Sequence, residues 1–186
     1  MKRRIWITLA VCLTVLVILT GCLVGWISRH GLAISECYYM ETLHGHMVVL
    51  DGSPVAMSGE ERLFQGLTTG DRVIVIHGII AESYPGQAEG YFCFKQADGT
   101  QTDIPARVRA SMKQMGWLPL PFSSEEAEAL AHLYTGYCFS MATAAEDPET
   151  GDWTVVLRDE DAEYQETVRF SADGKNVTIA SGMLYR

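Results

Sequence analysis

The sequence predicts a mainly β protein with short helices (fold class α+β), in which an N-terminal membrane segment precedes a small β-barrel, a helix and an antiparallel β-meander. Three observations support this prediction. Residues 5–27 carry no charge. Much of the remaining chain consists of short runs of β-branched and aromatic residues separated by glycine, proline and aspartate, which is typical of strands joined by turns. Two helix-start patterns interrupt these runs, at residues 103–105 and 123–126.

Residues 1–30 form the predicted membrane segment. A basic cluster at residues 2–4 precedes the uncharged run and holds the N-terminus on the cytoplasmic side of a membrane. A helix over residues 5–27 would be roughly 34 Å long at about 1.5 Å per residue, enough to cross a hydrocarbon core of about 30 Å. Trp6 and Trp26 lie near its ends, where indole rings prefer to sit. We expect a single anchor in the cell membrane, with the bulk of the chain outside the cytoplasm.

The same segment has a second interpretation as a lipoprotein signal. Leu19-Thr20-Gly21-Cys22 has the form of a bacterial lipidation box, in which the chain is cut before Cys22 and that cysteine is lipidated. The residues after Cys22 stay apolar as far as Ile27, whereas a lipidated chain usually continues with a polar tether. Both interpretations place the rest of the chain outside the cytoplasm.

Residues 35–117 form the predicted barrel with a C-terminal helix. Strands are expected at residues 37–40, 46–50, 72–77, 91–95 and 101–104, with turns at 51–54, 67–71 and 97–100. The turn at 97–100 is expected to close a hairpin onto the strand at 101–104. The run at 72–77 is apolar almost throughout, which predicts burial on both faces of its strand.

The helix of this part is expected to begin after Asp103. Asp103 is the expected N-cap, and Pro105 falls in the first turn, where its missing N–H is not needed. The side chains expected on one helix face are those of Val108, Met112 and Met115. Gly116 is expected to end the helix, and residues 117–121 form an extended joint to the second half.

Residues 122–186 form the predicted helix and β-meander. Ser123 and Glu126 have the spacing of a capping box, so a helix is expected from there to about residue 133. Four antiparallel strands are expected, around residues 137–141, 153–157, 168–170 and 177–179. A competing interpretation extends the helix to Met141 and leaves three strands after it.

The charge and the cysteines narrow the classes of partner and chemistry. The formal net charge is −9, which disfavours attraction to DNA, RNA or anionic lipid, so we expect no nucleic-acid partner. Three cysteines lie beyond the N-terminal segment, namely Cys37, Cys93 and Cys138. At most one disulfide can form among them, and Cys37–Cys93 is the favoured pair.

Two sequence strings resemble those of a known protein group: Leu-Thr-Thr-Gly-Asp-Arg-Val-Ile-Val at residues 67–75 and Ile-Ala-Glu-Ser-Tyr-Pro-Gly-Gln at residues 80–87. This part of the chain, about residues 45–90, resembles the YobA-like group of small exported proteins from Gram-positive bacteria. The resemblance implies an OB-like five-stranded barrel and an extracytoplasmic setting. It implies no reaction and no ligand, and it does not extend to the helix after residue 103 or to the C-terminal half.

Glu82, Tyr84 and Gln87 are the candidate ligand-binding residues. Pro85 restricts Tyr84 to an extended conformation, and Gly86 permits a tight bend. On an OB-like barrel these side chains would lie on a rim, where OB folds bind ligands. The alternative is that Tyr84 covers the barrel core and Glu82 accepts hydrogen bonds from the backbone of its own loop.

No residue pattern predicts a catalytic group, a metal site or a cofactor. His44 and His46 lie on the same side of an extended chain, and His77 is a distant third candidate for a metal ligand. We interpret this pair as part of a solvated hairpin, since no third ligand lies nearby in the sequence. The acidic residues 159–161 lack the spacing of a calcium loop and are interpreted as a solvated turn.

These observations lead to one main functional hypothesis and two alternatives. The main hypothesis is a membrane-anchored extracytoplasmic module that binds an envelope protein or a small ligand without catalysis. One alternative is a structural or sensory envelope protein, whose anchors pair through Gly21 and Gly25. The other is a hydrolase or transferase of envelope polymers with Glu82 as acid/base, for which the sequence supplies no second catalytic group.

Overall fold

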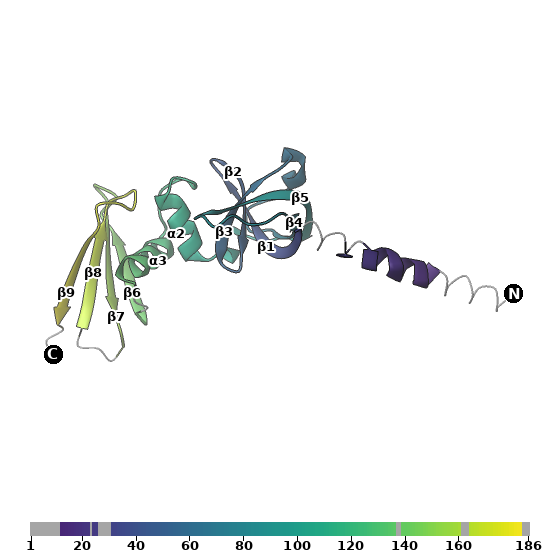
Figure 1. Ribbon diagram of the computed structural model, residues 1–186. Helices are drawn as coiled ribbons and strands as arrows, with labels where there is room; N and C mark the ends of the chain where they lie inside the picture. The colour runs from purple at the N-terminus through teal and green to yellow at the C-terminus, as the bar shows by residue number, and fades with distance from the viewer. Residues whose placement is uncertain (1–11, 23, 26–30, 137–138, 161–163, 184–186) are drawn as a thin grey trace.

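The computed structural model describes residues 12–22, 24–25, 31–136, 139–160 and 164–183. These residues form a mainly β structure with short helices, as predicted. Figure 1 shows the strands in two separate groups, with two short helices, α2 and α3, between them. The barrel lies on the side of the N-terminus, and the second sheet lies on the side of the C-terminus.

The predicted membrane segment lies only partly within this description. Residues 12–22 are helical, and so are residues 24–25. Within the described part of the chain, no helix combines the length and the apolar character that a membrane span requires. Residues 1–11, 23 and 26–30 belong to the predicted span but lie outside the described residues, so the anchor stays a prediction.

The first group of strands forms a closed barrel. Its strands are β1 (Ala33–Thr42), β2 (Gly45–Leu50), β3 (Ser53–Ser58), β4 (Arg72–His77) and β5 (Gly86–Ala97). They pair in the order β1-β2-β3-β5-β4, and β4 pairs with β1 to complete the ring. The pairing of β3 with β5 is parallel, and the other pairings are antiparallel. Buried side chains fill the interior, among them Tyr39, Val48, Val55, Phe64 and Val75.

The strand β3 was not predicted from the sequence. The sequence predicts a turn over residues 51–54, but only Asp51 and Gly52 form the turn, with positive φ angles of 48° and 74°. Pro54 lies in β3 opposite Val49, and its buried neighbour Val55 belongs to the barrel interior. A proline near the start of a strand is tolerated there because fewer ladder hydrogen bonds need its missing N–H.

The prediction that β4 is buried on both faces was wrong. Val73 and Val75 point into the barrel and are 0 % and 1 % exposed, but Ile74 and Ile76 on the outer side are only partly covered. The strand is therefore apolar for two different reasons. Its inner residues build the core, and its outer residues belong to an apolar surface of the barrel.

The predicted hairpin onto residues 101–104 was also wrong. Gln101–Asp103 forms a short 3-10 helix, η2, in place of a strand. The carboxylate of Asp103 accepts a hydrogen bond of 2.7 Å from the Thr100 backbone N–H, so it serves this turn and does not cap the next helix. That helix, α2 (Ala106–Gln114), starts at Pro105 without a side-chain cap. Met115 lies beyond its end and is 43 % exposed, so it does not continue the predicted apolar face.

Helix α2 is buried on two sides. Val108 and Met112 pack against the outer face of the barrel, where they join a cluster with Met40, Met47 and Val49 of β1 and β2. Ala110, on another side of α2, belongs to the core of the C-terminal part. The helix is therefore shared between the barrel and the second sheet.

The C-terminal part follows the predicted order of a helix and four antiparallel strands. The elements are α3 (Ser124–Thr135), β6 (Met141–Glu146), β7 (Trp153–Arg158), β8 (Tyr164–Phe170) and β9 (Thr178–Met183). The strands pair in the order β6-β7-β8-β9. Trp153, Val155 and Leu157 are buried on one face of β7, and they share a core with Leu130 of α3.

The capping box at the start of α3 is confirmed. The Ser123 hydroxyl accepts a hydrogen bond from the Glu126 backbone N–H at 3.3 Å, and the Glu126 carboxylate accepts one from the Ser123 N–H at 2.8 Å. The competing extension of this helix to Met141 is wrong, because α3 ends at Gly136, whose φ of 67° is left-handed. The first strand begins at Met141 rather than spanning 137–141, and residues 137–138 lie outside the described chain.

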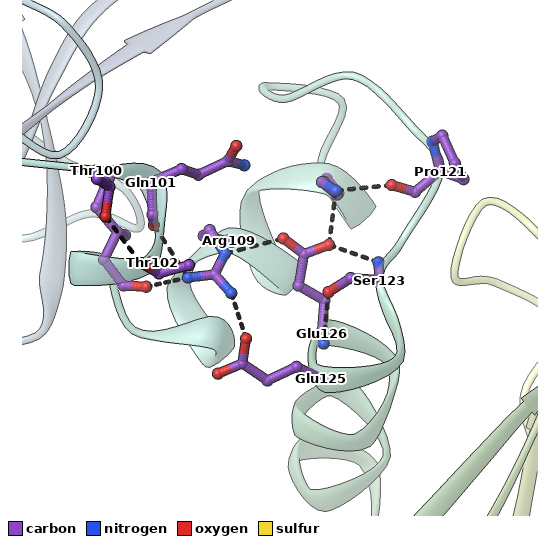
Figure 2. A network of polar contacts seen from close by, with 10 residues as sticks. Thr100, Gln101, Thr102, Arg109, Pro121, Ser123, Glu125 and Glu126 are labelled. Atoms are coloured by element: carbon purple, nitrogen blue, oxygen red, sulfur yellow. Dashed lines mark hydrogen bonds and ion pairs between the residues drawn. The ribbon is translucent and has the colours of Figure 1, made fainter.

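A buried ion-pair network joins α2 to α3 (Figure 2). The carboxylate of Glu126, 2 % exposed, accepts hydrogen bonds from Arg109 Nε at 2.9 Å and from Lys113 Nζ at 2.6 Å. Arg109 also donates to Glu125 at 2.8 Å and to the backbone carbonyls of Gln101 and Ile104. Burial alone would raise the pKa of Glu126, but the hydrogen bonds from Lys113, the Ser123 N–H and Arg109 outweigh it and lower that pKa.

We expect Glu126→Ala to lower the free energy of unfolding by about 3–5 kcal/mol, because it leaves Arg109 buried without its main counter-charge. Glu125→Ala is the matched control. The Glu125 side chain pairs with the same guanidinium but is 66 % exposed, so its loss should cost no more than about 1 kcal/mol. Urea denaturation of the two variants at neutral pH measures both values. Equal effects would show that the buried carboxylate does not hold the helices together.

A second buried carboxylate, that of Asp71, connects the loop at Thr68 with the loop at Gly99 at one end of the barrel. It is fully buried and accepts hydrogen bonds from the backbone N–H groups of Thr68 and Gly99 and from Lys95 Nζ at 2.7 Å. The two loops touch backbone to backbone, since a Cβ atom at Gly70 would overlap the carbonyl of Thr100. Burial acts to raise the pKa of Asp71, but these donors lower it to about 2.

We expect Asp71→Asn to destabilise the protein by about 1–3 kcal/mol at pH 7, because charge-assisted hydrogen bonds are lost. Since the pKa of Asp71 is lowered on folding, its charge stabilises the protein fully above the ordinary value of 3.8 and progressively less as the pH falls toward 2. The difference in unfolding free energy between the two proteins should therefore shrink between pH 4 and pH 2. A difference that stayed constant over this range would contradict the assignment.

Candidate functional site

A group of polar and aromatic side chains surrounds a hollow where β1, β2 and the short helix η1 (Glu61–Phe64) meet. The hollow has a volume of about 450 Å³, which is within the range of small-molecule sites. The side chains that give it its chemistry are Tyr39, Glu41, His46, Glu61, Arg62 and Phe64. We call this group the η1 hollow.

Three aromatic rings form the base of the η1 hollow. The rings of His46 and Phe64 are stacked with centroids 4.6 Å apart. The rings of Tyr39 and Phe64 are also stacked, with centroids 6.0 Å apart. Tyr39 Oη lies 2.7 Å from His46 Nδ1. Burial, with a smaller contribution from Glu41, raises the pKa of Tyr39 to about 12, so its hydroxyl stays protonated at neutral pH. This hydroxyl can donate a hydrogen bond to Nδ1 or accept one from it.

The rim of the η1 hollow is charged and mostly acidic. Glu41 and Glu61 contribute exposed carboxylates, and Arg62 contributes one guanidinium, which pairs with Glu60. Glu41 lies at the end of β1 directly opposite His46 in β2, so strand pairing fixes the distance between this carboxylate and the aromatic base. The rim can therefore accept hydrogen bonds from the hydroxyl or amino groups of a ligand, while the base offers ring faces.

The residues predicted from the sequence lie elsewhere on the barrel. Glu82, Tyr84 and Gln87 are all exposed, on or next to the loop between β4 and β5. Tyr84 is 58 % exposed, so the alternative in which it covers the barrel core is wrong. The loop is held by its own backbone, through hydrogen bonds from Ala81 N–H to Gln87 and from Ser83 N–H to Ala81.

The predicted loop and the η1 hollow lie at opposite ends of β1. His77, just before the loop, pairs with Ala33 at the start of β1, whereas Glu41 and His46 pair at its other end. Eight residue steps lead from Ala33 to Glu41, which corresponds to roughly 26 Å along a strand. Glu82, Tyr84 and Gln87 are not among the residues that line the hollow.

The histidines considered as metal ligands have separate environments. His46 belongs to the η1 hollow, but His44 lies 3.1 Å from the Gly116 carbonyl and packs edge-on against Trp117. His77 is buried and lies 2.9 Å from the Ser35 hydroxyl. Over the residues with described positions, no group of three or more His, Cys, Asp or Glu side chains could hold a metal ion.

The η1 hollow was not predicted from the sequence. Its members come from β1, β2 and the segment before β4, and no short motif links them. The sequence does contain one indication of this group. Tyr39 and Glu41 lie two residues apart and so share one face of a strand, and His46 lies at the start of the next strand, after a tight turn. Phe64 lies beside them because of the short helix η1, which the hydrophobic pattern of the sequence did not predict.

Comparison of the chain with family models, with curated proteins and with solved structures finds no match. The proposed function therefore rests on the residues of the surface.

The favoured disulfide between Cys37 and Cys93 is not formed, since both cysteines are free. Cys37 is buried inside the barrel, where burial and then the nearby Cys93 and Glu36 raise its pKa to about 12. Burial raises the pKa of Cys93 to about 11. The thiolate is the reactive form, so neither side chain is a candidate nucleophile at neutral pH.

We expect iodoacetamide at pH 8 to leave Cys37 and Cys93 unmodified in the folded protein, because fewer than about one thiol in a thousand is ionised at that pH. In urea, both should be alkylated within the same reaction time. Mass spectrometry of the proteolytic peptides distinguishes the two positions. Rapid labelling of Cys37 in the folded state would mean that the barrel opens around it.

Proposed function

We propose that this protein is a membrane-anchored extracytoplasmic module whose OB-like barrel binds a small ligand in the η1 hollow without catalysis. The five-stranded ring with the order β1-β2-β3-β5-β4 supports the OB-like part of this proposal. The uncharged run behind a basic cluster supports the anchor and the extracytoplasmic setting.

The single observation that carries the binding function is the η1 hollow itself. A stacked aromatic base offers apolar ring faces, and the Glu41 and Glu61 carboxylates offer acceptors at the rim. This combination suits a ligand with an apolar face and several hydrogen-bond donors, such as a sugar unit or an amino sugar of an envelope polymer. An acidic rim disfavours phosphate and carboxylate ligands, because like charges would repel them.

The other hypotheses stay predictions without support from a specific contact. A hydrolase that uses Glu82 would need a second carboxylate or another acid/base group within about 5–10 Å of it. Glu82 lies on the loop at the far end of β1 from Glu41 and Glu61. An envelope protein could contact Glu82, Tyr84 and Gln87, which remain exposed for that purpose.

We expect the full-length protein in detergent to bind glucosamine and N-acetylglucosamine oligomers, and Glu61→Gln to weaken that binding roughly 10- to 100-fold, the equivalent of one charge-assisted hydrogen bond of about 1.5–3 kcal/mol. Isothermal titration measures the affinities. Glu82→Gln is the matched control, because it removes an exposed carboxylate from the β4–β5 loop, outside the lining of the hollow.

The two variants separate the candidate sites. Weakening by Glu61→Gln alone places the ligand in the η1 hollow. Weakening by Glu82→Gln alone places it on the β4–β5 loop and overturns the proposal for the hollow. Absence of binding by the wild-type protein to these saccharides would refute the proposed ligand class.

A further inference from the structure

The barrel has an exposed apolar face on the outer side of β1, β4 and β5. Ile34, Ile76 and Phe92 are paired neighbours across these three strands, and Ile74 pairs with Phe94 one step further along. Ile34, Phe92 and Phe94 are each 55–56 % exposed, and the two phenylalanine rings stack with centroids 6.3 Å apart. We call these five residues the outer apolar face. Contiguous exposed apolar groups of this kind mark surfaces that bind protein or membrane.

This face begins where the chain enters the barrel. Ile34 is the second residue of β1, and six residues separate it from Ile27 at the end of the uncharged run. Ile79, 81 % exposed, adds to the apolar surface at this entrance, since a Cβ atom at Gly31 would lie 3.7 Å from its Cδ1. Seven Cα–Cα steps reach at most about 25 Å, so an anchored chain keeps Ile34 within that distance of the hydrocarbon core.

We infer that the outer apolar face rests on the lipid surface next to the anchor, with Phe92 and Phe94 in the interfacial layer of the bilayer. This inference depends on the anchor in the proposed function. The headgroup layer on each side of the core is only about 5–8 Å thick, which is well within the reach of the tether. Phenylalanine and isoleucine side chains gain free energy by leaving water for this layer, and the anchor removes most of the entropic cost of approach.

The charges around this face are compatible with lipid. Glu36 lies on the same outer side, opposite Ile74, and its carboxylate is paired with Arg72 on the neighbouring strand. The net charge of −9 disfavours long-range attraction to anionic lipid, but a tethered contact between apolar side chains and the interface does not need that attraction. Docking in this way also leaves the η1 hollow at the end of β1 away from the membrane-proximal entrance.

Site-specific photo-crosslinking in full-length protein tests this inference. Phe92 or Phe94 is replaced by p-benzoylphenylalanine, which keeps an aromatic ring at an exposed position, and the protein is reconstituted in phosphatidylcholine vesicles. Leu43 is the matched control. It is 63 % exposed on the same barrel but lies in the turn between β1 and β2, at the other end of β1 from Ile34. Circular dichroism confirms that each variant keeps its fold, and mass spectrometry counts lipid adducts after irradiation.

We expect lipid adducts at positions 92 and 94 to exceed those at position 43 several-fold. Equal yields at all three positions, or adducts at 92 and 94 that join two protein chains, would overturn the inference while leaving the anchor intact. Flotation of the vesicles after an alkaline carbonate wash tests the anchor separately. A chain that does not float refutes the anchor in the proposed function and the docking that depends on it.

Discussion

The two halves of this protein depend on one buried carboxylate. Glu126 caps its own helix through Ser123 and also neutralises Arg109 and Lys113 of α2, so a single side chain defines the start of α3 and its contact with α2. A buried charge is tolerated only when its partners are buried with it and their donors are used, and Arg109 meets this condition through two backbone carbonyls besides its carboxylates. The network therefore specifies which surfaces of the two helices meet, whereas apolar packing alone would accept several arrangements.

The position of α2 extends this constraint to the barrel. Its apolar residues cover β1 and β2, while Ala110 enters the core of the C-terminal part. Helix α2 covers β2 and the Met40 end of β1. The Ile34 end of β1, together with β4 and β5, stays uncovered, and its outer apolar residues are exposed or only partly buried. The end of the barrel at η1 also stays open, because α2 packs on a wall and not on that rim. The fold thus separates the outer apolar face from the η1 hollow.

Features that depend on residues close together in the sequence could be predicted, whereas those that depend on contacts between distant segments could not. Ser123 and Glu126 predicted a helix start because a capping box is encoded within four residues. The alternation after residue 140 predicted the meander because neighbouring strands pair in order. The prediction that the strand at residues 72–77 is buried on both faces was wrong, because an exposed apolar face has the same residue composition as a buried one. The η1 hollow could not be predicted, because Tyr39, His46 and Phe64 come from three separate segments that only the tertiary fold brings together.

The parallel contact between β3 and β5 has a consequence for how the barrel is made. Val55 pairs with Gly86 across thirty-one positions of sequence, and the ring stays open until β5 is present. A chain emerging N-terminus first across a membrane would present β1 to β4 with unsatisfied strand edges until residue 97 had passed. If the chain is exported N-terminus first, as proposed, the barrel can close only after β5 has crossed the membrane. A chain stalled before that point would expose open sheet edges to envelope proteases and chaperones.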